Sequence, residues 1–323
     1  MQNKNILVTG GAGFIGSHLV EALAKEKPAG IVVVDNLFLG KEDNLTTARE
    51  LFPGLKFFRE SAADYKVMGD ICRREQVEVI FDLAVIPLPK SLEAPKFTVD
   101  ENVMIVSTLC ELARQGFYQT LVHFSSSEIY GTAQAPAMAE DHPTRPLTPY
   151  AASKLAGCHV VLSYRATFGL DATIVLPFNN YGPRQNEKAY AGIIPKVIGE
   201  CLAGKQVTIF GDGRQTRDFI FVKDTVQAAI ACYKNPDTRG KVINLGSGKA
   251  TAILDLVRQL VILAGGDPEK ILFGPERPGD VRRHLADVSL AKKLIGFTPE
   301  VNLEEGLKIT FAWYREHWQE TSV

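Results

Sequence analysis

The chain has 323 residues, of which 46% are hydrophobic and 23% are charged, a composition close to that of an average globular protein. A chain of this size buries a sizeable core without disulfides or metals, which excludes the disordered, collagen-like and disulfide-stapled classes. The 36 Lys and Arg residues against 37 Asp and Glu residues leave a net charge of −1. No basic excess therefore indicates a nucleic-acid partner or an anionic membrane surface.

Short apolar runs alternate with longer helical patterns through the first half of the chain. The runs predicted as strands are Asn5–Thr9, Ile31–Asp35, Leu55–Phe58, Val79–Leu83, Thr120–Ser125 and Ala172–Leu176. The helical patterns lie near Ile15–Lys25, Lys66–Arg74, Val99–Gln115 and Tyr150–Phe168. Apolar strands separated by helices predict an α/β fold, in which a doubly wound parallel sheet is covered on both faces.

The regular alternation of strand and helix patterns ends at about Pro177. A turn-rich segment, Asn179–Gln185, is followed by a helical pattern near Ile193–Ala203 and then by irregular pieces. We predict two domains, residues 1–177 with the sheet and residues 178–323 as a smaller α/β lobe, some of whose segments return to the sheet.

The number and spacing of the cysteines and histidines indicate the cellular compartment and whether the chain binds a metal. The five cysteines are an odd number without a CxxC motif, and the six histidines lack metal-ligand spacing. We expect a reducing, cytoplasmic location and no metal site. The first residues run straight into a strand pattern, which predicts no signal peptide, and the apolar stretch Ile253–Ala264 is interrupted by charged residues, so no membrane span is expected.

A glycine-rich loop follows the first predicted strand. Gly10, Gly13 and Gly16 have the GxxGxxG spacing in Thr9-Gly10-Gly11-Ala12-Gly13-Phe14-Ile15-Gly16. Such glycines permit a tight turn, close approach of the backbone to a pyrophosphate, and close packing of the next helix. Asp35 ends the next strand, where an acid accepts hydrogen bonds from ribose hydroxyls and repels a 2′-phosphate. The pattern predicts a Rossmann-type site that prefers NAD over NADP.

A tyrosine and a lysine share one face of a predicted helix. Tyr150 and Lys154 are spaced i, i+4 after Pro149, and the segment Ser125-Ser126-Ser127-Glu128 ends an upstream strand. A lysine ammonium beside a tyrosine lowers the pKa of the phenol, which suits a general base acting on a hydroxyl group. A serine hydroxyl can hold the substrate oxygen within reach of that base.

These motifs together resemble the extended short-chain dehydrogenase/reductases, which are NAD-dependent epimerases, dehydratases and decarboxylases of nucleotide-diphosphate sugars. The similarity extends over nearly the whole chain. It includes Asn102, the segment Pro177–Arg184, and two arginine motifs, Gln215–Phe219 and Arg277–Asp280. The resemblance implies a tightly bound, recycled NAD, a nucleotide-diphosphate-sugar substrate and a homodimer formed through the helices near Val99–Gln115 and Tyr150–Phe168.

The motifs and the resemblance together predict the site residues. The residues expected to bind the cofactor are Gly10, Gly13, Phe14, Ile15, Gly16, Asp35, Asn36, Leu83, Ala84, Asn102, Ser125, Tyr150 and Lys154. The expected catalytic residues are Ser126, Ser127, Glu128, Tyr150 and Lys154. The expected substrate-binding residues are Lys90, Asn179, Arg217 and Arg277, the two arginines at the diphosphate.

Glu128 bears on the reaction outcome. In such enzymes Tyr150 would deprotonate the carbon-4 hydroxyl as hydride leaves carbon 4, and the outcomes then diverge. Ser126-Ser127-Glu128 is similar to the strand end of 4,6-dehydratases, where the glutamate removes the carbon-5 proton, and also to that of UDP-glucuronate decarboxylases. We therefore favour a 4,6-dehydratase. A 4-epimerase is the main alternative, followed by a uronate decarboxylase and a non-catalytic NAD sensor. The alternative role of Glu128 is a structural one, in which its carboxylate fixes the loop at the strand end.

Several positions depart from the pattern of the resembled enzymes. Their usual His-Leu-Ala-Ala strand end is Asp82-Leu83-Ala84-Val85 in this chain, and an unusual proline-rich loop with Lys90 follows it. Ser127 stands where dTDP-glucose dehydratases carry an aspartate, and Glu60-Ser61 replaces the adenine-side Gly-Asp. The loop with Lys90 indicates an uncommon substrate, Ser127 leaves the acid that protonates the leaving hydroxyl unassigned, and Glu60-Ser61 weakens one expected cofactor contact.

Overall fold

Seven parallel strands form the main sheet of the computed structural model, which describes residues 1–186, 191–276 and 281–318. The strand order is β10-β6-β5-β4-β1-β2-β3. The strands are β1 (Asn5–Thr9), β2 (Gly30–Val34), β3 (Lys56–Phe58), β4 (Val79–Asp82), β5 (Thr120–Phe124), β6 (Asp171–Pro177) and β10 (Val242–Leu245). The predicted α/β class with a doubly wound parallel sheet is confirmed.

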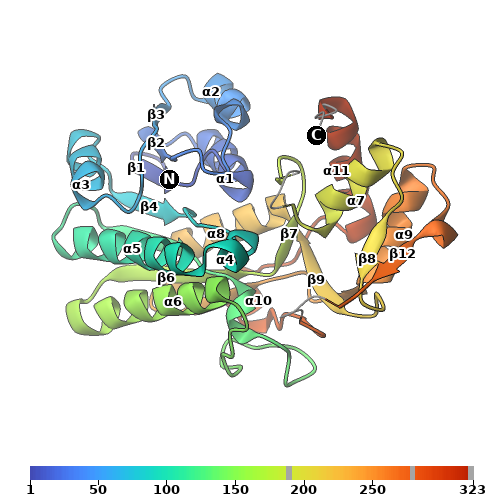
Figure 1. The fold of residues 1–323 in the computed structure, drawn as a ribbon. Coiled ribbons are helices and arrows are strands. Elements are labelled where there is room, and N and C mark those ends of the chain that lie inside the picture. The colour runs from blue at the N-terminus through green and yellow to red at the C-terminus, as the bar shows by residue number, and fades with distance from the viewer. Residues whose placement is uncertain (187–190, 277–280, 319–323) are drawn as a thin grey trace.

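Helices cover both faces of this sheet, and successive side chains of each strand point to opposite faces, where they pack in two separate apolar cores. Leu7 and Ile80 pack under α3 (Tyr65–Arg74), α5 (Pro95–Arg114) and α6 (Pro149–Phe168), which lie together in Figure 1. Ile6 and Phe81 pack on the other face, against α1 (Phe14–Lys25) and α8 (Val222–Lys234). Short helices complete these layers, namely α2 (Thr46–Leu51), α4 (Leu88–Glu93) and α10 (Ser289–Ile295).

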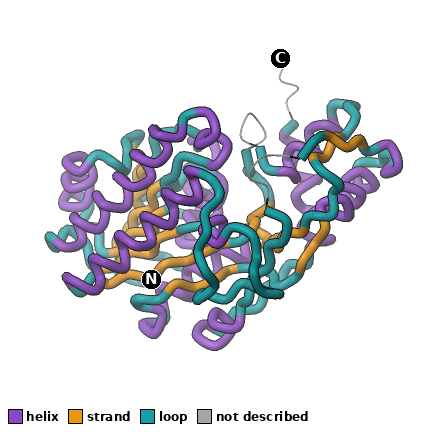
Figure 2. The backbone as a smooth tube through the Cα atoms, turned by 60° about the horizontal axis from the view of Figure 1, so that its bottom comes forward, coloured by secondary structure: helices purple, strands orange, loops and turns teal. Residues whose placement is uncertain are grey.

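A smaller part stands beside the sheet (Figures 1 and 2). It contains a three-stranded sheet of β11 (Ala250–Ala252), β9 (Thr216–Phe221) and β7 (Asn179–Tyr181), and a pair of β12 (Leu272–Gly274) with β8 (Thr208–Phe210). The helices α7 (Ile193–Leu202), α9 (Ile253–Leu263) and α11 (Leu303–His317) enclose a separate apolar core around Ile198, Leu256 and Phe311.

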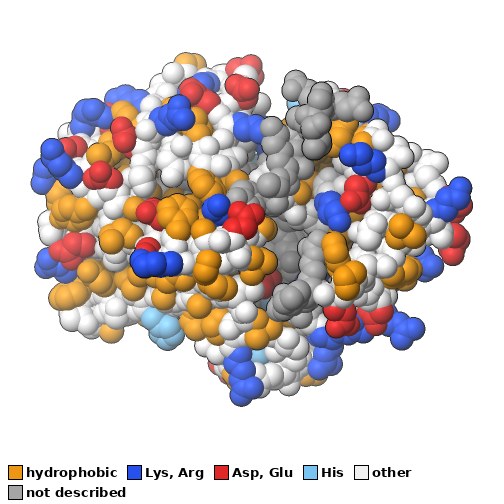
Figure 3. Space-filling view, viewed as in Figure 1, with side chains coloured by type: hydrophobic (Ala, Val, Ile, Leu, Met, Phe, Trp, Pro, Cys, Tyr) orange, Lys and Arg blue, Asp and Glu red, His pale blue; other side chains and the backbone are white. Residues whose placement is uncertain are grey.

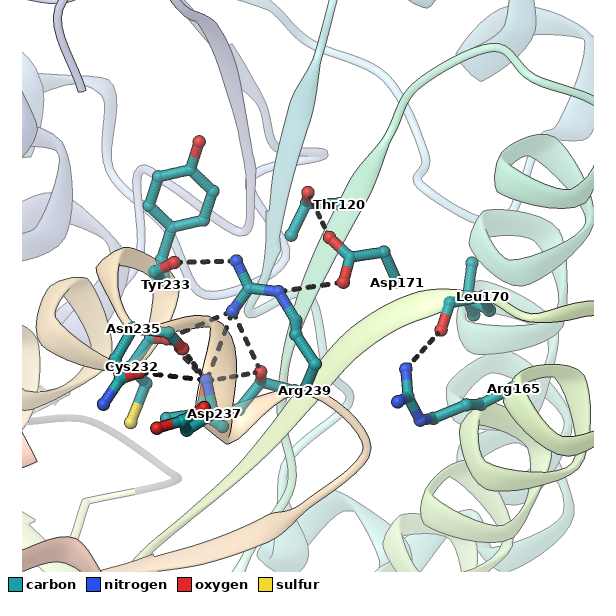
Figure 4. A network of polar contacts seen from close by, with 11 residues as sticks. Thr120, Arg165, Leu170, Asp171, Cys232, Tyr233, Asn235, Asp237 and Arg239 are labelled. Carbon is teal, nitrogen blue, oxygen red and sulfur yellow. Dashed lines mark hydrogen bonds and ion pairs between the residues drawn. The ribbon is translucent and has the colours of Figure 1, made fainter. Parts of the chain in front are cut away.

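The chain after Pro177 contributes to both parts. Strand β10 pairs with β6 of the main sheet, and α8 packs against α1. A polar network fastens this return at the amino-terminal edge of the sheet (Figure 4): the Arg239 guanidinium lies 2.9 Å from the Asp171 carboxylate and donates to the carbonyl oxygen of Tyr233 at 2.7 Å. A division of the chain at residue 177 stays a prediction, and the cofactor-side layers include later segments.

Candidate functional site

Two adjoining cavities lie at the carboxyl-terminal edge of the main sheet, where ligands of such folds bind. The first, of about 390 Å³, extends over the ends of β1, β2, β4 and β5, and the second is about 320 Å³. They share the lining residues Val85, Pro87, Ser126, Tyr150, Phe178, Asn180 and Gln185. A ligand in one cavity therefore contacts the same wall as a ligand in the other.

The glycine loop forms the floor of the first cavity. Gly10 has φ +63°, and a Cβ on Gly16 would lie only 2.2 Å from the carbonyl oxygen of Gly10. Helix α1 begins here with Gly13 as its N-cap, without a side-chain cap and without an acidic residue in its first turn. Gly13, Phe14, Ile15 and Gly16 line the cavity, so the positive end of the helix dipole faces a site suited to a pyrophosphate.

Asp35 is held beside this loop. Its side chain is 7% exposed and accepts hydrogen bonds from the amides of Ala12 at 3.0 Å and Leu37 at 2.8 Å. Burial raises the pKa of Asp35, and these two bonds oppose the rise. Asn36, Glu60 and Ser61 line the same end of the cavity, so the replaced adenine-side pair remains at the site.

Tyr150 and Lys154 come from the first turns of α6. Thr148 caps this helix through its hydroxyl, which accepts from the amide of Ala151 at 3.2 Å. Tyr150 lines both cavities and Lys154 the first. The Lys154 ammonium donates to the carbonyl oxygen of Phe124 at 2.6 Å.

The pKa of Tyr150 differs from the expectation. Burial raises it to about 12, the hydrogen bond with Ser126 lowers it, and the charge of Glu128 raises it. Lys154, whose ammonium donates to the carbonyl oxygen of Phe124, is not among the groups that shift this pKa, and the lowering expected from it stays a prediction.

The serine-rich strand end forms a tight turn beside Tyr150. The Ser126 hydroxyl accepts from the amide of Glu128 at 3.2 Å, and Ser126, Ser127 and Glu128 line the second cavity. His284 lies 3.1 Å from the carbonyl oxygen of Ser127 through its Nε2 atom and fixes the turn from the other side. Ser125 lines the first cavity, and its hydroxyl donates to the carbonyl oxygen of Lys154 at 3.3 Å.

Other predicted residues lie at varying distances from the cavities. Leu83 and Ala84 line the first cavity and Asn179 the second. Asn102 lines neither; its side chain accepts from the amide of Ile86 at 2.7 Å and thereby supports the loop after β4. Lys90 lines neither cavity and lies 3.1 Å from the carboxylate of Glu93.

The two predicted diphosphate arginines have different positions in the structure. Arg217 lies in β9, donates to the carbonyl oxygens of Thr216 and Val281, and lines neither cavity. Arg277 lies outside the described residues. The contact of both with a diphosphate stays a prediction.

Two amides at the junction of the cavities were missed as site residues. The side-chain oxygens of Asn180 and Gln185 are buried and have no hydrogen-bond partner among the described residues. Buried polar atoms without a partner are rare and indicate a ligand or water position. Their place at the ends of the turn Tyr181–Arg184 was the available signal.

Within the described ranges, no group of three or more His, Cys, Asp or Glu side chains could hold a metal ion. Across those same residues, no helix is both long and apolar enough to cross a membrane.

Comparisons with known proteins agree with this geometry. The family model described as "NAD dependent epimerase/dehydratase family" matches residues 6–246. A UDP-glucose 4-epimerase of Mycolicibacterium smegmatis is 37% identical, with 97% of this chain and 99% of that protein covered. A dTDP-glucose 4,6-dehydratase of Streptomyces griseus is 34% identical, with 99% and 97% covered.

Solved structures of both kinds of enzyme superpose on this chain. UDP-glucose 4-epimerase of Thermotoga maritima with UDP-glucose has a TM-score of 0.91 at 32% identity, covering 97% of this chain and 99% of that one. The dTDP-glucose 4,6-dehydratase DesIV of Streptomyces venezuelae with NAD bound has a TM-score of 0.91 at 29% identity, covering 97% of each chain. The predicted NAD-dependent enzyme is confirmed at the level of the family. The chain belongs to the NAD-dependent epimerase/dehydratase family, the extended short-chain dehydrogenase/reductases.

Proposed function

We propose that this enzyme is an NAD-dependent 4,6-dehydratase of a nucleotide-diphosphate sugar. The observation that carries the proposal is the position of Glu128, which lines the second cavity together with Tyr150 and Ser126. A carboxylate beside the residue that deprotonates the carbon-4 hydroxyl can reach the carbon-5 proton, which the neighbouring ketone makes acidic.

The first cavity suits NAD. The glycine loop and the start of α1 would hold the pyrophosphate, Asp35 the adenosine ribose, and Lys154 the nicotinamide ribose. Bound there, NAD supplies a hydride acceptor for carbon 4 and later a hydride donor for carbon 6. The sugar would occupy the second cavity, with its diphosphate toward the lobe that carries Asn179 and Arg217.

The residues of the chain divide the proton transfers between them. In its phenolate form, Tyr150 accepts the proton of the carbon-4 hydroxyl while Ser126 holds the oxygen. Glu128 then removes the carbon-5 proton, which leaves with the carbon-6 hydroxyl as water. The proton taken from the carbon-4 hydroxyl restores carbon 5 when hydride reaches carbon 6, so the net change is the loss of one water.

Glu128 would serve as both base and acid. Among the described residues that line the second cavity it is the one carboxyl group, since Ser127 occupies the neighbouring position. A single carboxyl can take the carbon-5 proton and pass it to the carbon-6 hydroxyl on the same face of the sugar.

A 4-epimerase is the second candidate, and Ser127 is the observation that favours it. Without an acid at this position, Tyr150 and Ser126 suffice for the proton transfers at carbon 4, and bound NAD would take up and return the hydride. The apolar residues Pro87, Leu88 and Ile193 in the second cavity would let a keto sugar turn over.

Proton NMR of the purified enzyme with UDP-, dTDP-, GDP- and CDP-sugars tests the proposal. A new carbon-6 methyl signal identifies a dehydratase, a changed carbon-4 coupling pattern an epimerase, and a pentose product a decarboxylase. Glu128→Gln should lower formation of the 4-keto-6-deoxy product by about 100-fold or more, since general acid–base groups contribute 10²–10⁴. Ser127→Ala measures separately the catalytic role predicted for Ser127, which should be small if Glu128 serves as both base and acid. A wild-type rate for Glu128→Gln would show that the assignment is wrong.

We also infer a cytoplasmic homodimer. The free cysteines that the structure describes suit a reducing compartment. Phe97, Met104 and Phe168 on α5 and α6 are 43%, 54% and 56% exposed, on a face where apolar side chains gather (Figure 3). Exposed apolar patches of this kind mark association surfaces. Light scattering after size exclusion should give twice the mass of the chain, and Met104→Lys should shift the equilibrium toward the monomer.

A further inference from the structure

A buried pair of ionisable side chains lies beneath the catalytic residues. Asp82 ends β4 and is 1% exposed, and His123 lies opposite it in β5 and is 0% exposed. The Nδ1 atom of His123 is 2.7 Å from one carboxylate oxygen, and the hydroxyl of Thr9 donates to the other at 2.7 Å. Three adjacent strands thus place a polar row in the middle of the sheet, on the face covered by α5 and α6.

The charge of this pair follows from its burial and contacts. The two hydrogen bonds and the nearby Lys154 lower the pKa of Asp82 although burial opposes them. Burial and the charge of Lys154 lower the pKa of His123 below its ordinary value, although the hydrogen bond with Asp82 and the charge of Asp82 oppose the fall. The pair is therefore a carboxylate that accepts from a neutral imidazole, and it carries one net negative charge. A buried charge without a partner is strongly unfavourable, so a compensating cation is required.

Lys154 is the cation in reach of that charge. It is 5% exposed, its ammonium donates to the carbonyl oxygen of Phe124, and Phe124 directly follows His123 in β5. Burial, the larger effect, lowers the pKa of Lys154 below its ordinary value, and the carboxylate of Asp82 partly opposes that fall. The same Asp82–Thr9 contact supports the cofactor floor, because the Thr9 hydroxyl also accepts from the amides of Leu83 at 3.1 Å and Ala84 at 3.2 Å.

Glu101 lines the first cavity and Glu128 the second, but neither is among the charged groups that shift the pKa of Lys154, whereas Asp82 is. On its own helix, burial raises the pKa of Tyr150 to about 12 and raises that of the Cys158 thiol. On α5, burial raises the pKa of Cys110 to about 12. These groups are neutral near neutral pH, and His123 on β5 is uncharged, so Asp82 on β4 is the counter-charge.

We propose that Asp82 and His123 form a buried positioning pair that supplies the counter-charge holding Lys154 as an ammonium at the edge of the cofactor cavity. The proposal rests on the function proposed above for Lys154. It gives a role to the aspartate at a strand end where the resembled enzymes usually carry histidine. Asp82 sets the charge, and His123 and Thr9 fix its orientation.

Asp82→Asn in the NAD-loaded enzyme tests the charge while keeping the shape of the side chain. The measured quantity is the rate of NADH formation on adding a nucleotide sugar, as a function of pH. Without the carboxylate, Lys154 loses its proton at lower pH. The alkaline limb of the plot of rate against pH should therefore move to lower pH by about 1 unit, the size expected for the loss of a nearby charge. The KM for the sugar should change less than about twofold, because no sugar contact is altered.

His123→Asn is the matched variant, since an asparagine amide can donate from near the position of Nδ1 while Asp82 keeps its charge. Its alkaline limb should stay at the wild-type position. An unshifted limb in Asp82→Asn, or an equal shift in both variants, would overturn the proposal.

Direct titration of Lys154 keeps the test independent of turnover and of the folding of either variant. NMR of ¹³C-labelled lysine in the wild-type protein, with the signal assigned by Lys154→Met, should show an ammonium that persists above about pH 8. A Lys154 that is neutral at pH 7 would refute the positioning pair. If instead no nucleotide sugar is turned over while Lys154 titrates as expected, the proposed function fails and the pair stands.

Discussion

Substituting single glycines in the cofactor loop separates two roles of the motif, namely close packing of α1 on the loop and close approach of the backbone to the pyrophosphate. A Cβ on Gly16 would lie 2.2 Å from the carbonyl oxygen of Gly10, whereas ordinary contacts begin at 3.4 Å. The loop and α1 must therefore separate by about 1 Å in Gly16→Ala, and overpacking of this kind costs about 2 kcal/mol of the free energy of unfolding. The displaced helix start would also lose a charge-assisted bond to the pyrophosphate, so NAD should bind about 30-fold more weakly.

Gly13→Ala is the control within the same loop. Its Cβ would lie 3.1 Å from the same oxygen, a strain that a shift of a few tenths of an ångström relieves. The free energy of unfolding should change by less than about 0.5 kcal/mol. The added methyl group would lie on the lining of the cavity, so NAD should bind at least about tenfold more weakly. Urea unfolding of NAD-stripped protein and calorimetric titration with NAD measure the two quantities. Equal destabilisation by both variants, or a Gly16→Ala protein as stable as wild type, would refute the reasoning.

Two further predictions concern Asp35 and His284. Asp35→Asn should reduce the preference for NAD over NADP at least about tenfold, measured as the ratio of dissociation constants, because the charge that repels a 2′-phosphate is removed. His284 is fully buried, and burial lowers its pKa to about 4 from an ordinary value of 6.5. The unfolded chain therefore binds a proton that the native chain excludes, and stability present at pH 7 is lost as the pH falls from 6.5 to 4, by about 1 kcal/mol per pH unit. His284→Gln should remove that part of the slope in urea unfolding measured across this range, and an unchanged slope would contradict it.

The sequence predicted the sheet well where local pattern and neighbour order agree. Continuous apolar runs identified β1 to β6 to within a few residues at their ends, because buried parallel strands show no alternation. Strand β10 was not identified, since a four-residue run joins the sheet only through pairing with β6, which is far away in sequence. The direction of individual side chains could not be predicted either. Lys90 is close in sequence to residues that line the cavities, but in α4 its ammonium pairs with the carboxylate of Glu93.

The effect of Glu128 on the pKa of Tyr150 bears on which reaction the enzyme performs. The carboxylate of Glu128 raises the pKa of a phenol that burial has already raised to about 12, so it makes the base harder to ionise. A 4-epimerase gains nothing from such a neighbour, whereas a 4,6-dehydratase needs it for the carbon-5 proton. Glu128→Gln should therefore affect two steps in opposite directions. NADH formation should persist with its acid limb moved to lower pH, because Tyr150 ionises more readily, while the loss of water from the sugar slows by about 100-fold or more. An epimerase would keep its full turnover in this variant, so the two activities measured on one protein decide between the functions.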